Sequence, residues 1–421
     1  MRIAYLHQYF RTPEMGGGTR SFEMGKRLAA RGHVIHMITA DCAPKPGAPK
    51  WRVEQIGGMT IHWTPVRYEN KMRLPARMVA FLLFAVRAAS RTASIAPDVI
   101  FATSTPLTIA IPAIMAKRRT GAPMVLEVRD LWPDVPIALN ALRDPISRAM
   151  ARWLEMIAYR SSARIVALAP GMRDDIIAKR IPAERLTVIP NGADLDIFGP
   201  DVTRTEKLRE STPWLGSRPM VLYAGTIGIV NSVDYLVQVA AATWPLDSEI
   251  RFVVAGTGRE EQRVRDLAAR LGVLDRNFFM LGEMSKSLVA EWLSAATMSI
   301  ALLTGPRIVW KDAVSNKFFD ALAAGCPVAN NFDGYSSQVA CEAGAGIIID
   351  ANDQAVAAAQ LVRHLRDEDW LTSAGAASLA LGRGQFSRDR LAGELEEVLL
   401  EVAVQDGGLK HGDSTLYQES A

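Results

Sequence analysis

The chain has 421 residues, which is long enough for two domains with full hydrophobic cores. Hydrophobic residues make up 49% and charged residues 22%, and the net charge of +3 is too small to indicate nucleic acid as a partner. There is neither a secretory signal pattern nor a run of about 18 apolar residues, so we expect a cytoplasmic protein without a membrane span.

The first residues predict a parallel sheet. A strand over 2–9 is followed by a glycine triplet at 16–18, a helix over 19–31 and a strand over 34–38. Such a βαβ unit places ligand-binding groups at the carboxyl ends of its strands. The glycines do not fit G-x-G-x-x-G, and no suitably spaced acidic residue closes the second strand. The loop therefore favours a sugar or phosphate over NAD.

Residues 66–92 are unusually basic, with six Lys or Arg residues and one acidic residue, Glu69. Between Arg77 and Arg87 lies MVAFLLFAV, which is apolar on every face but, at nine residues, too short to cross a bilayer. The segment either enters one leaflet while its arginines meet anionic headgroups, or forms a helix buried against the sheet with basic ends.

A charged pair, Arg129 and Asp130, follows the predicted strand 123–128. The carboxyl end of a buried strand is where α/β sheets place groups that face a ligand. A salt bridge that closes the loop is the alternative interpretation.

No part of the sequence predicts a metal site. Cys42, Cys326 and Cys341 are too scattered for a disulfide or zinc site, which indicates a reducing compartment. The segment 194–196 matches the D-x-D pattern of many sugar transferases, but it lies in a turn beside Asn191, so we expect no metal there.

The second half repeats the α/β pattern after a polar, proline-containing stretch at 199–218. Its strands end in glycine or small polar residues, which predicts a second ligand-binding edge. We expect domains over 1–198 and 199–386, a last helix over 387–404 and a disordered tail over 405–421.

The stretch 310–331, WKDAVSNKFFDALAAGCPVANN, carries the strongest site signal. Ser315 is a good N-cap for a helix over 316–324, and Gly325 ends that helix before a strand begins. Lys317 lies in the first turn, where the helix dipole disfavours a cation by about 0.3–1 kcal/mol.

An anion in front of this helix would remove that penalty, because backbone N–H groups and Lys317 would hold it together. Asp312 and Asp320 lie on either side and can accept hydrogen bonds from sugar hydroxyls. This arrangement suits a phosphorylated sugar, and a capped core helix with solvated charges is the alternative.

Taken together, residues 1–404 resemble the retaining nucleotide-sugar glycosyltransferases of family 4. The resemblance is greatest to bacterial enzymes of surface-polysaccharide assembly, particularly N-acetyl-L-fucosamine transferases. The matching segments, in chain order, are HQYF…GGGTRSFE, RGHVIHMIT, EVRDLWPD, LAPGM, VIPNGADLDIF, LYAGTIG, VVAGTG, MLGEM and SNKFFDALAAGCPV. The resemblance implies the GT-B fold, an α/β architecture of two Rossmann-like domains with parallel sheets facing across a cleft. The last helix would cross back to the N-terminal domain.

The resemblance also implies roles for matching residues. Two family glutamates correspond to Asp312, which would meet the transferred sugar, and Asp320, which would meet the ribose. Lys317 would hold the diphosphate and act in catalysis with Asp130 and Asp312. The other implied donor-binding residues are Gly16, Gly17, Arg129, Thr226, Gly228, Met284, Ser315 and Asn316.

This sequence departs from the family where basic residues usually follow the first strand of the second domain. Thr226 and Asn231 occupy those places. Either Lys317 carries more of the diphosphate charge, or another base supplies it: Arg129, Arg307 or Lys311.

The implied reaction is transfer of a sugar from a nucleotide donor, with UDP favoured, to a lipid-linked or glycan acceptor. It would proceed by same-face attack, without metal or cofactor, in synthesis of a bacterial surface polysaccharide such as O-antigen. We expect a cytoplasmic enzyme at the inner face of the plasma membrane. The alternatives are a non-hydrolysing nucleotide-sugar epimerase and a non-catalytic nucleotide-sugar-binding protein.

Overall fold

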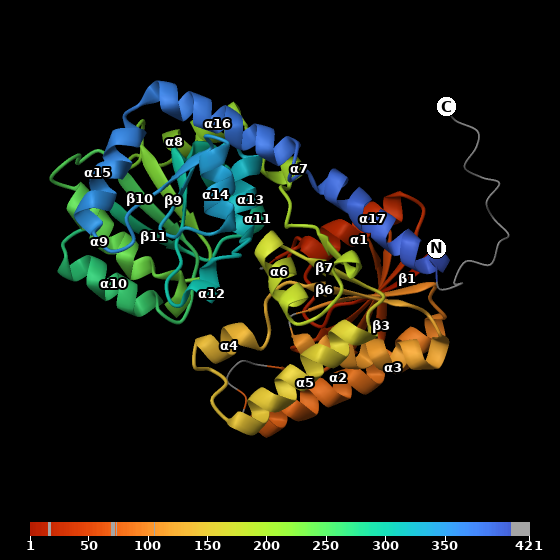
Figure 1. The fold of residues 1–421 in the computed structure, drawn as a ribbon. Coiled ribbons are helices and arrows are strands. Elements are labelled where there is room, and N and C mark those ends of the chain that lie inside the picture. Colours follow the sequence, from red (N-terminus) through yellow and green to blue (C-terminus); the bar gives the residue numbers. More distant parts are fainter. Residues whose placement is uncertain (16–17, 69–71, 73, 105, 406–421) are drawn as a thin grey trace, which may run out of the picture. The chain divides into compact units, whose positions relative to one another are not determined.

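The computed structural model describes residues 1–15, 18–68, 72, 74–104 and 106–405, which form two compact units (Figure 1). Unit 1 contains Met1–Thr12, Thr19–Ile189 and the chain from Leu391, and unit 2 contains Pro13–Gly18 and Pro190–Arg390. The chain enters unit 2 at Pro190, before the expected boundary at 199, and returns to unit 1 within the last helix. Our predictions for Gly16, Gly17 and the tail from residue 406 fall outside the described residues.

Unit 1 is built on an eight-stranded sheet with strand order β3-β4-β2-β1-β5-β6-β7-β8. Neighbouring strands are parallel except β3 and β4, which pair antiparallel at one edge. The inner strands are buried on both faces, which explains their successive apolar residues. The strands are β1 (Arg2–Leu6), β2 (Val34–Asp41), β3 (Arg52–Ile56), β4 (Met59–Pro65), β5 (Val99–Thr103), β6 (Met124–Val128), β7 (Arg164–Ala167) and β8 (Leu186–Val188).

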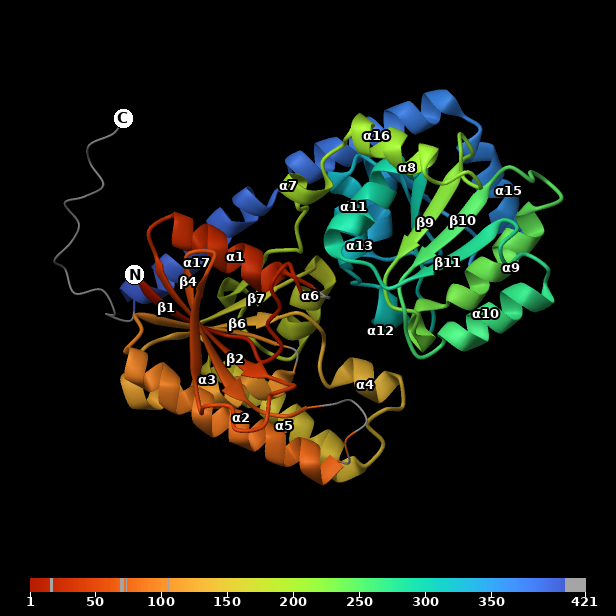
Figure 2. The same ribbon diagram turned by 180° about the vertical axis from the view of Figure 1, so that it is seen from behind.

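Helices cover both faces of this sheet, with α1 and α17 on one face and α2, α3 and α5 on the other (Figures 1 and 2). Glu396 of α17 lies 2.7 Å from both Arg31 Nη1 and His33 Nε2, which ties the last helix to the end of α1. The helices are α1 (Arg20–Ala30), α2 (Leu74–Ile95), η1 (Leu107–Ile109), α3 (Ala110–Thr120), α4 (Asp134–Ala138), α5 (Pro145–Ser161), α6 (Pro170–Ala178), η2 (Ala183–Arg185) and α17 (Arg388–Gln405).

Helix α2 is longer than the nine-residue apolar run in its centre. Over Ala76–Ile95 it is long and apolar enough to cross a membrane by length and composition, so our length argument against a span does not hold. Phe84 and neighbouring alanines of α2 are buried inside unit 1, whereas Val79 and Leu82 are each 65% exposed. One face of the helix is thus packed on the fold, as in our second alternative, and the other is an exposed apolar surface; entry into a leaflet stays a prediction.

Two arginines of the basic segment bind groups of unit 1. Arg87 donates hydrogen bonds to Thr64 Oγ1 at 3.1 Å and to Pro65 O at 2.8 Å. Arg91 Nε donates to His62 Nδ1 at 3.1 Å. β4 thus engages both guanidinium groups, as expected for a helix packed on the sheet with basic ends, and contact of the segment with lipid headgroups stays a prediction.

Unit 2 contains a six-stranded parallel sheet with strand order β11-β10-β9-β12-β13-β14. Successive residues of its strands pack alternately into two hydrophobic cores. Val221 and Tyr223 of β9 pack with α9, α10 and α15, whereas Met220 and Leu222 pack with α11 and α13. The strands are β9 (Met220–Ala224), β10 (Arg251–Ala255), β11 (Phe278–Gly282), β12 (Met298–Ala301), β13 (Val328–Asn330) and β14 (Gly346–Ile348).

The helices of unit 2 are α7 (Leu195–Phe198), α8 (Val202–Glu210), η3 (Ile229–Asn231), α9 (Val233–Thr243), α10 (Glu261–Arg270), α11 (Lys286–Ala295), α12 (Arg307–Trp310), α13 (Asn316–Ala323), α14 (Tyr335–Glu342), α15 (Gln354–Leu365) and α16 (Glu368–Arg383). The predicted sequence of strands and helices is therefore present in both units, and each unit is an α/β fold.

Candidate functional site

The amino end of α13 is the centre of the candidate site in unit 2. Ser315 occupies the N-cap position as predicted, but within the described residues its hydroxyl makes no capping hydrogen bond. The amide of Asn191 instead donates to Asn316 Oδ1 at 2.7 Å and to Val314 O at 3.4 Å. Asn191 therefore fixes the approach to the helix without covering its first-turn N–H groups by a side-chain cap.

Lys317 extends from the first turn of α13 to the end of β9. Its Nζ donates a hydrogen bond to Tyr223 Oη at 3.1 Å and lies 4.3 Å from the centre of the Tyr223 ring. Burial lowers the pKa of Lys317 to about 8. A Cβ atom at Gly225 would lie only 3.1 Å from Lys317 Cε, so the lysine passes closely over that glycine. This geometry holds a partly desolvated cation at the carboxyl edge of the sheet.

Two glycine loops pack against each other beside this lysine. A Cβ atom at Gly256 would lie 1.9 Å from Gly225 O, and one at Gly258 would lie 2.2 Å from Ile227 O. The N–H of Ile227 donates to Thr257 O at 2.9 Å. Only glycine permits these backbone contacts, which shape the exposed turn that contains Thr226.

Gly228 continues this turn and lines a cavity of about 260 Å³ with Ser232 and Thr304, among other residues. Met284 follows β11 and packs partly buried against the core formed with α11 and α13. Both predicted residues are therefore near the carboxyl ends of the strands, as the parallel-sheet argument requires.

Asp320 lies one turn into α13, near an ion-pair cluster formed by Asp194 with Arg388 and Lys286. Burial raises the pKa of Asp320 to about 7, although Lys286 and Arg388 oppose that rise. At neutral pH its carboxyl can therefore donate as well as accept a hydrogen bond. Asp194 was predicted to be a turn residue, and its ion pairs give it a structural role.

Asp312, the second predicted carboxylate, is buried before α13, with one oxygen 3.6 Å from Lys311 Nζ. The structure therefore places Lys317 and Asp320 in α13 and Asp312 four residues before its first residue. Among the described residues, no group of three or more His, Cys, Asp or Glu side chains could hold a metal ion.

The other two predicted residues, Arg129 and Asp130, follow β6 in unit 1. The N–H of Arg129 donates to Ser104 Oγ at 2.9 Å, and Asp130 is exposed. They lie in a different unit from the α13 group, so unit 1 presents its own set of polar groups at its sheet edge.

Sequence reasoning missed a buried ion pair in unit 1. Arg20 donates to Glu127 Oε1 through Nε at 2.9 Å and Nη2 at 2.8 Å, and to Ile189 O at 3.0 Å. Thr103 Oγ1 donates to the other carboxylate oxygen at 2.6 Å. Burial alone would raise the pKa of Glu127, but Arg20 and its hydrogen bonds outweigh burial and lower it. The signal was a lone glutamate in the otherwise apolar strand MVLEV.

Tyr223 and Asn191 were also missed as partners of the α13 group. In the sequence, Tyr223 fits the apolar pattern of a buried strand and Asn191 fits the pattern of a turn. Their contacts depend on the packing of separate strands and loops, which no local pattern records.

Two sequence families match this chain. The family described as "Glycosyl transferase 4-like domain" matches residues 15–192, and "Glycosyl transferases group 1" matches residues 204–377. The fold and these two matches define a glycosyltransferase of the GT-B class. The chain belongs to glycosyltransferase family 4, as the sequence resemblance predicted.

Three curated relatives show distant similarity to the chain. The chain is 29% identical to alpha-D-kanosaminyltransferase of Streptomyces kanamyceticus, over 45% of this chain and only 48% of that protein. It is 25% identical to D-inositol 3-phosphate glycosyltransferase of Xylanimonas cellulosilytica over 90% of both chains. It is 24% identical to the colanic acid biosynthesis glycosyl transferase WcaI of Escherichia coli, over 64% of this chain and 69% of that one.

Solved structures share the fold. Sucrose-phosphate synthase from Thermosynechococcus elongatus has a TM-score of 0.77 at 16% identity, covering 96% of this chain and 99% of that one. Anabaena HepE, solved in complex with UDP-glucose, has a TM-score of 0.72 at 14% identity, covering 95% of this chain and 100% of that one. These likenesses establish the GT-B fold.

Proposed function

We propose that this glycosyltransferase transfers a sugar from a UDP-sugar, with retention of anomeric configuration, to a lipid-linked or glycan acceptor. The observation that carries the proposal is Lys317 at the amino end of α13. A desolvated lysine beside uncapped helix N–H groups is a site for a diphosphate. HepE, which shares the fold, was solved with UDP-glucose, and this supports UDP as the nucleotide.

The proposed chemistry depends on stabilising the departing diphosphate. Negative charge grows on that group as the bond to the sugar breaks, and Lys317 with the α13 dipole would stabilise it in place without reorganisation. Because these groups neutralise the charge, the reaction needs no metal ion or cofactor in our proposal. Asp312 and Asp320 would bind the sugar and the ribose, and Asp130 would act on the acceptor side.

We further propose a role in synthesis of a bacterial surface polysaccharide, at the cytoplasmic face of the plasma membrane. The likeness to WcaI, named for colanic acid biosynthesis, supports the pathway class. The exposed apolar face of α2 supports peripheral attachment, with Val79 and Leu82 each 65% exposed.

Thermal stability with UDP, GDP, ADP and NAD, each with and without EDTA, tests the donor assignment. A nucleotide at about 100 times its Kd should add about 2.7 kcal/mol to the unfolding free energy. We expect UDP to stabilise the wild type, EDTA to have no effect, and Lys317→Met to abolish the shift. Stabilisation by NAD alone, or an EDTA-sensitive UDP shift, would refute the donor site as proposed.

Product analysis then tests transfer and retention. Incubation with UDP-sugars and a lipid extract should release UDP only when both are present. NMR of the product should show that the transferred sugar keeps the anomeric configuration that it has in the donor. Conversion of the donor without an acceptor would indicate an epimerase instead.

A further inference from the structure

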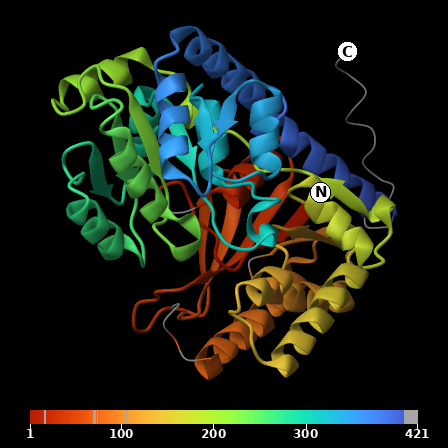
Figure 3. The same ribbon diagram turned by 60° about the vertical axis from the view of Figure 1, so that its left-hand side comes forward.

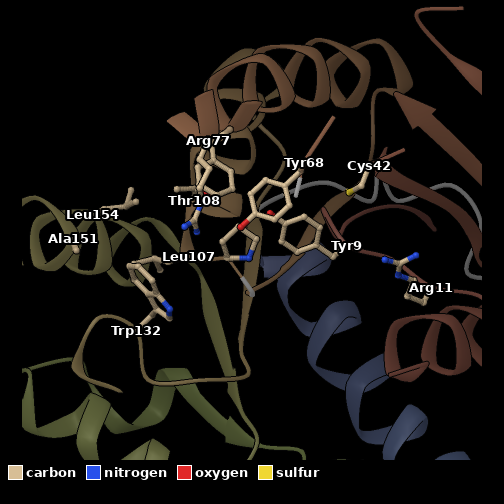
Figure 4. Close-up of a pocket in the computed structure, with 12 residues that line it drawn as sticks. Tyr9, Arg11, Cys42, Tyr68, Arg77, Leu107, Thr108, Trp132, Ala151 and Leu154 are labelled. Carbon is tan, nitrogen blue, oxygen red and sulfur yellow. The ribbon is translucent and has the colours of Figure 1, made fainter. Parts of the chain in front are cut away.

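Unit 1 contains a second cavity, separate from the α13 group, of about 520 Å³ (Figure 4). Its walls come from the ends of β1 and β2, from α2 and α5, from η1 and from the turn at Trp132. The lining residues are Tyr9, Arg11, Cys42, Tyr68, Arg77, Phe81, Pro106, Leu107, Thr108, Trp132, Ala151 and Leu154. The proposed donor chemistry uses none of these side chains.

Aromatic rings form a continuous wall of this cavity. The Tyr9 and Tyr68 ring centres are 5.1 Å apart, and those of Tyr68 and Phe81 are 5.6 Å apart. The guanidinium carbon of Arg77 lies 5.6 Å from the centre of the Tyr68 ring. In Figure 4, Trp132 lies on the side of the cavity where α5 contributes Ala151 and Leu154. The wall is thus apolar apart from a cation set among the rings.

The charged lining favours an anion. Arg11 and Arg77 line the cavity, and no Asp, Glu, Asn or Gln is among the described residues around it. Three buried polar atoms of the lining, Tyr9 Oη, Arg77 Nε and Thr108 Oγ1, have no hydrogen-bond partner among the described residues. Buried donors of this kind are normally satisfied, so they point to a ligand with oxygen acceptors. A phosphate group fits both their charge and their donor character.

The two helices that border the cavity also expose apolar side chains to solvent. On α2 these are Met78, Val79, Leu82, Leu83 and Val86, spaced to lie on one face, with exposed fractions of 39–65%. On α5 they are Ile146, Met150 and Trp153, each at least 60% exposed. The two helices run side by side (Figures 1 and 3). A cationic cavity therefore lies next to an extended apolar surface.

We propose that this cavity binds the phosphate-bearing head of a lipid-linked acceptor, whose hydrocarbon chain lies along the exposed faces of α2 and α5. The inference rests on the proposed function, because it selects the lipid-linked class from the two acceptor classes named there. The described lining has no carboxylate or amide side chains, which accept and donate hydrogen bonds to sugar hydroxyls, and its arginines favour an anionic group over a neutral glycan. A phosphate joined to a long hydrocarbon chain matches both the arginine and the adjoining apolar faces.

The exposed apolar residues of α2 run from Met78 to Val86, about 12 Å along the helix axis, so part of a hydrocarbon chain can lie along them. Arg77 lies in the first turn of that helix and lines the cavity together with Phe81, whereas Val79 and Leu82 lie on the outer side of the helix. A ligand held by Arg77 would therefore reach the apolar face by passing around the helix near its amino end. The acceptor's phosphate would accept hydrogen bonds from Arg77 Nε and Thr108 Oγ1.

Farnesyl diphosphate is a suitable probe, with inorganic diphosphate as its head and farnesol as its tail. Binding to the full chain is measured by calorimetry below the aggregation concentration of each lipid. We expect Arg77→Gln to weaken farnesyl diphosphate binding at least tenfold, and Thr108→Val to weaken it less. The double variant Val79→Ser/Leu82→Ser should weaken farnesyl diphosphate binding severalfold while leaving inorganic diphosphate binding unchanged. Arg119→Gln, an exposed arginine of α3, serves as the matched control.

Several outcomes would overturn the inference. They are equal affinity for farnesyl diphosphate and inorganic diphosphate, equal affinity for farnesyl diphosphate and farnesol, or unchanged binding in Arg77→Gln. Binding of UDP is measured on the same variants. Retained UDP binding shows that unit 2 is folded, and a circular dichroism spectrum and unfolding transition like those of the wild type show that unit 1 is folded, so that a loss then concerns the cavity. If the wild type binds farnesyl diphosphate but does not bind UDP, the donor proposal is refuted and this inference stands.

Discussion

Replacing Lys317 by methionine should weaken UDP binding and at the same time stabilise the unliganded protein. Methionine keeps the unbranched apolar stem but removes the charge and the hydrogen bond to Tyr223. A charge-assisted hydrogen bond to phosphate contributes about 1.5–3 kcal/mol, so Kd should rise by about 10- to 150-fold. Burial lowers the pKa of Lys317 to about 8, which means that the folded chain carries its charge at a cost. Removing that charge should raise the unfolding free energy by about 1–3 kcal/mol.

The same lysine predicts a pH dependence with a definite sign. Only protonated Lys317 attracts the diphosphate, and an anion raises the pKa of a neighbouring lysine. UDP affinity should therefore be constant below pH 8 and fall above it, by roughly tenfold between pH 7.5 and pH 9.

Calorimetric titration of UDP at several pH values, on wild type and Lys317→Met, measures both effects. Thermal unfolding without ligand measures the stability change. The reasoning is refuted if the variant binds UDP as tightly as the wild type, or if wild-type affinity does not change between pH 7.5 and pH 9. A less stable unliganded variant would show that Lys317 packs favourably and that its charge is not strained by burial.

Three further predictions concern stability and membrane contact. Glu127→Gln should lower the unfolding free energy measured in urea by about 3–5 kcal/mol, because it leaves Arg20 buried without its counter-charge. The double variant Arg20→Met/Glu127→Leu should lower it by less, and equal losses of unfolding free energy would contradict this. The pKa of Asp320 is raised to about 7, so its contribution to the unfolding free energy is complete below pH 4 and is lost as pH rises through 7. In Asp320→Asn the unfolding free energy should therefore depend less on pH between pH 5 and 8 than in the wild type. Flotation with anionic liposomes should fall for Leu82→Glu and not for Val202→Glu, a matched exposed apolar residue of α8.

Local sequence patterns predicted most of the fold because they act over short distances. Alternation of buried strands with glycine-ended helices predicted two parallel sheets. The cap, the lysine and the glycine around α13 marked its start and end within a few residues of 316–323. The family resemblance added the GT-B assignment, which the matching families and the shared fold confirm.

Tertiary structure decided which partners these residues have. Lys317 meets Tyr223 because α13 begins beside the end of β9, and the two residues are 94 positions apart. Arg20 meets Glu127 across 107 positions. No spacing rule in the sequence predicts contacts between a helix and a strand that are distant in the chain.

The same limit applied to α2. Its central run, MVAFLLFAV, is apolar on every face, so composition could not choose between a buried helix and a surface one. The sheet covers Phe84 and leaves Leu82 exposed, and β4 takes up Arg87. Sequence by itself determined which residues form each element and where ligand-binding edges lie, because hydrophobic period, caps and turns are local. Only the packing of those elements decided which side chains are desolvated, paired or exposed, because burial depends on neighbours from the whole unit.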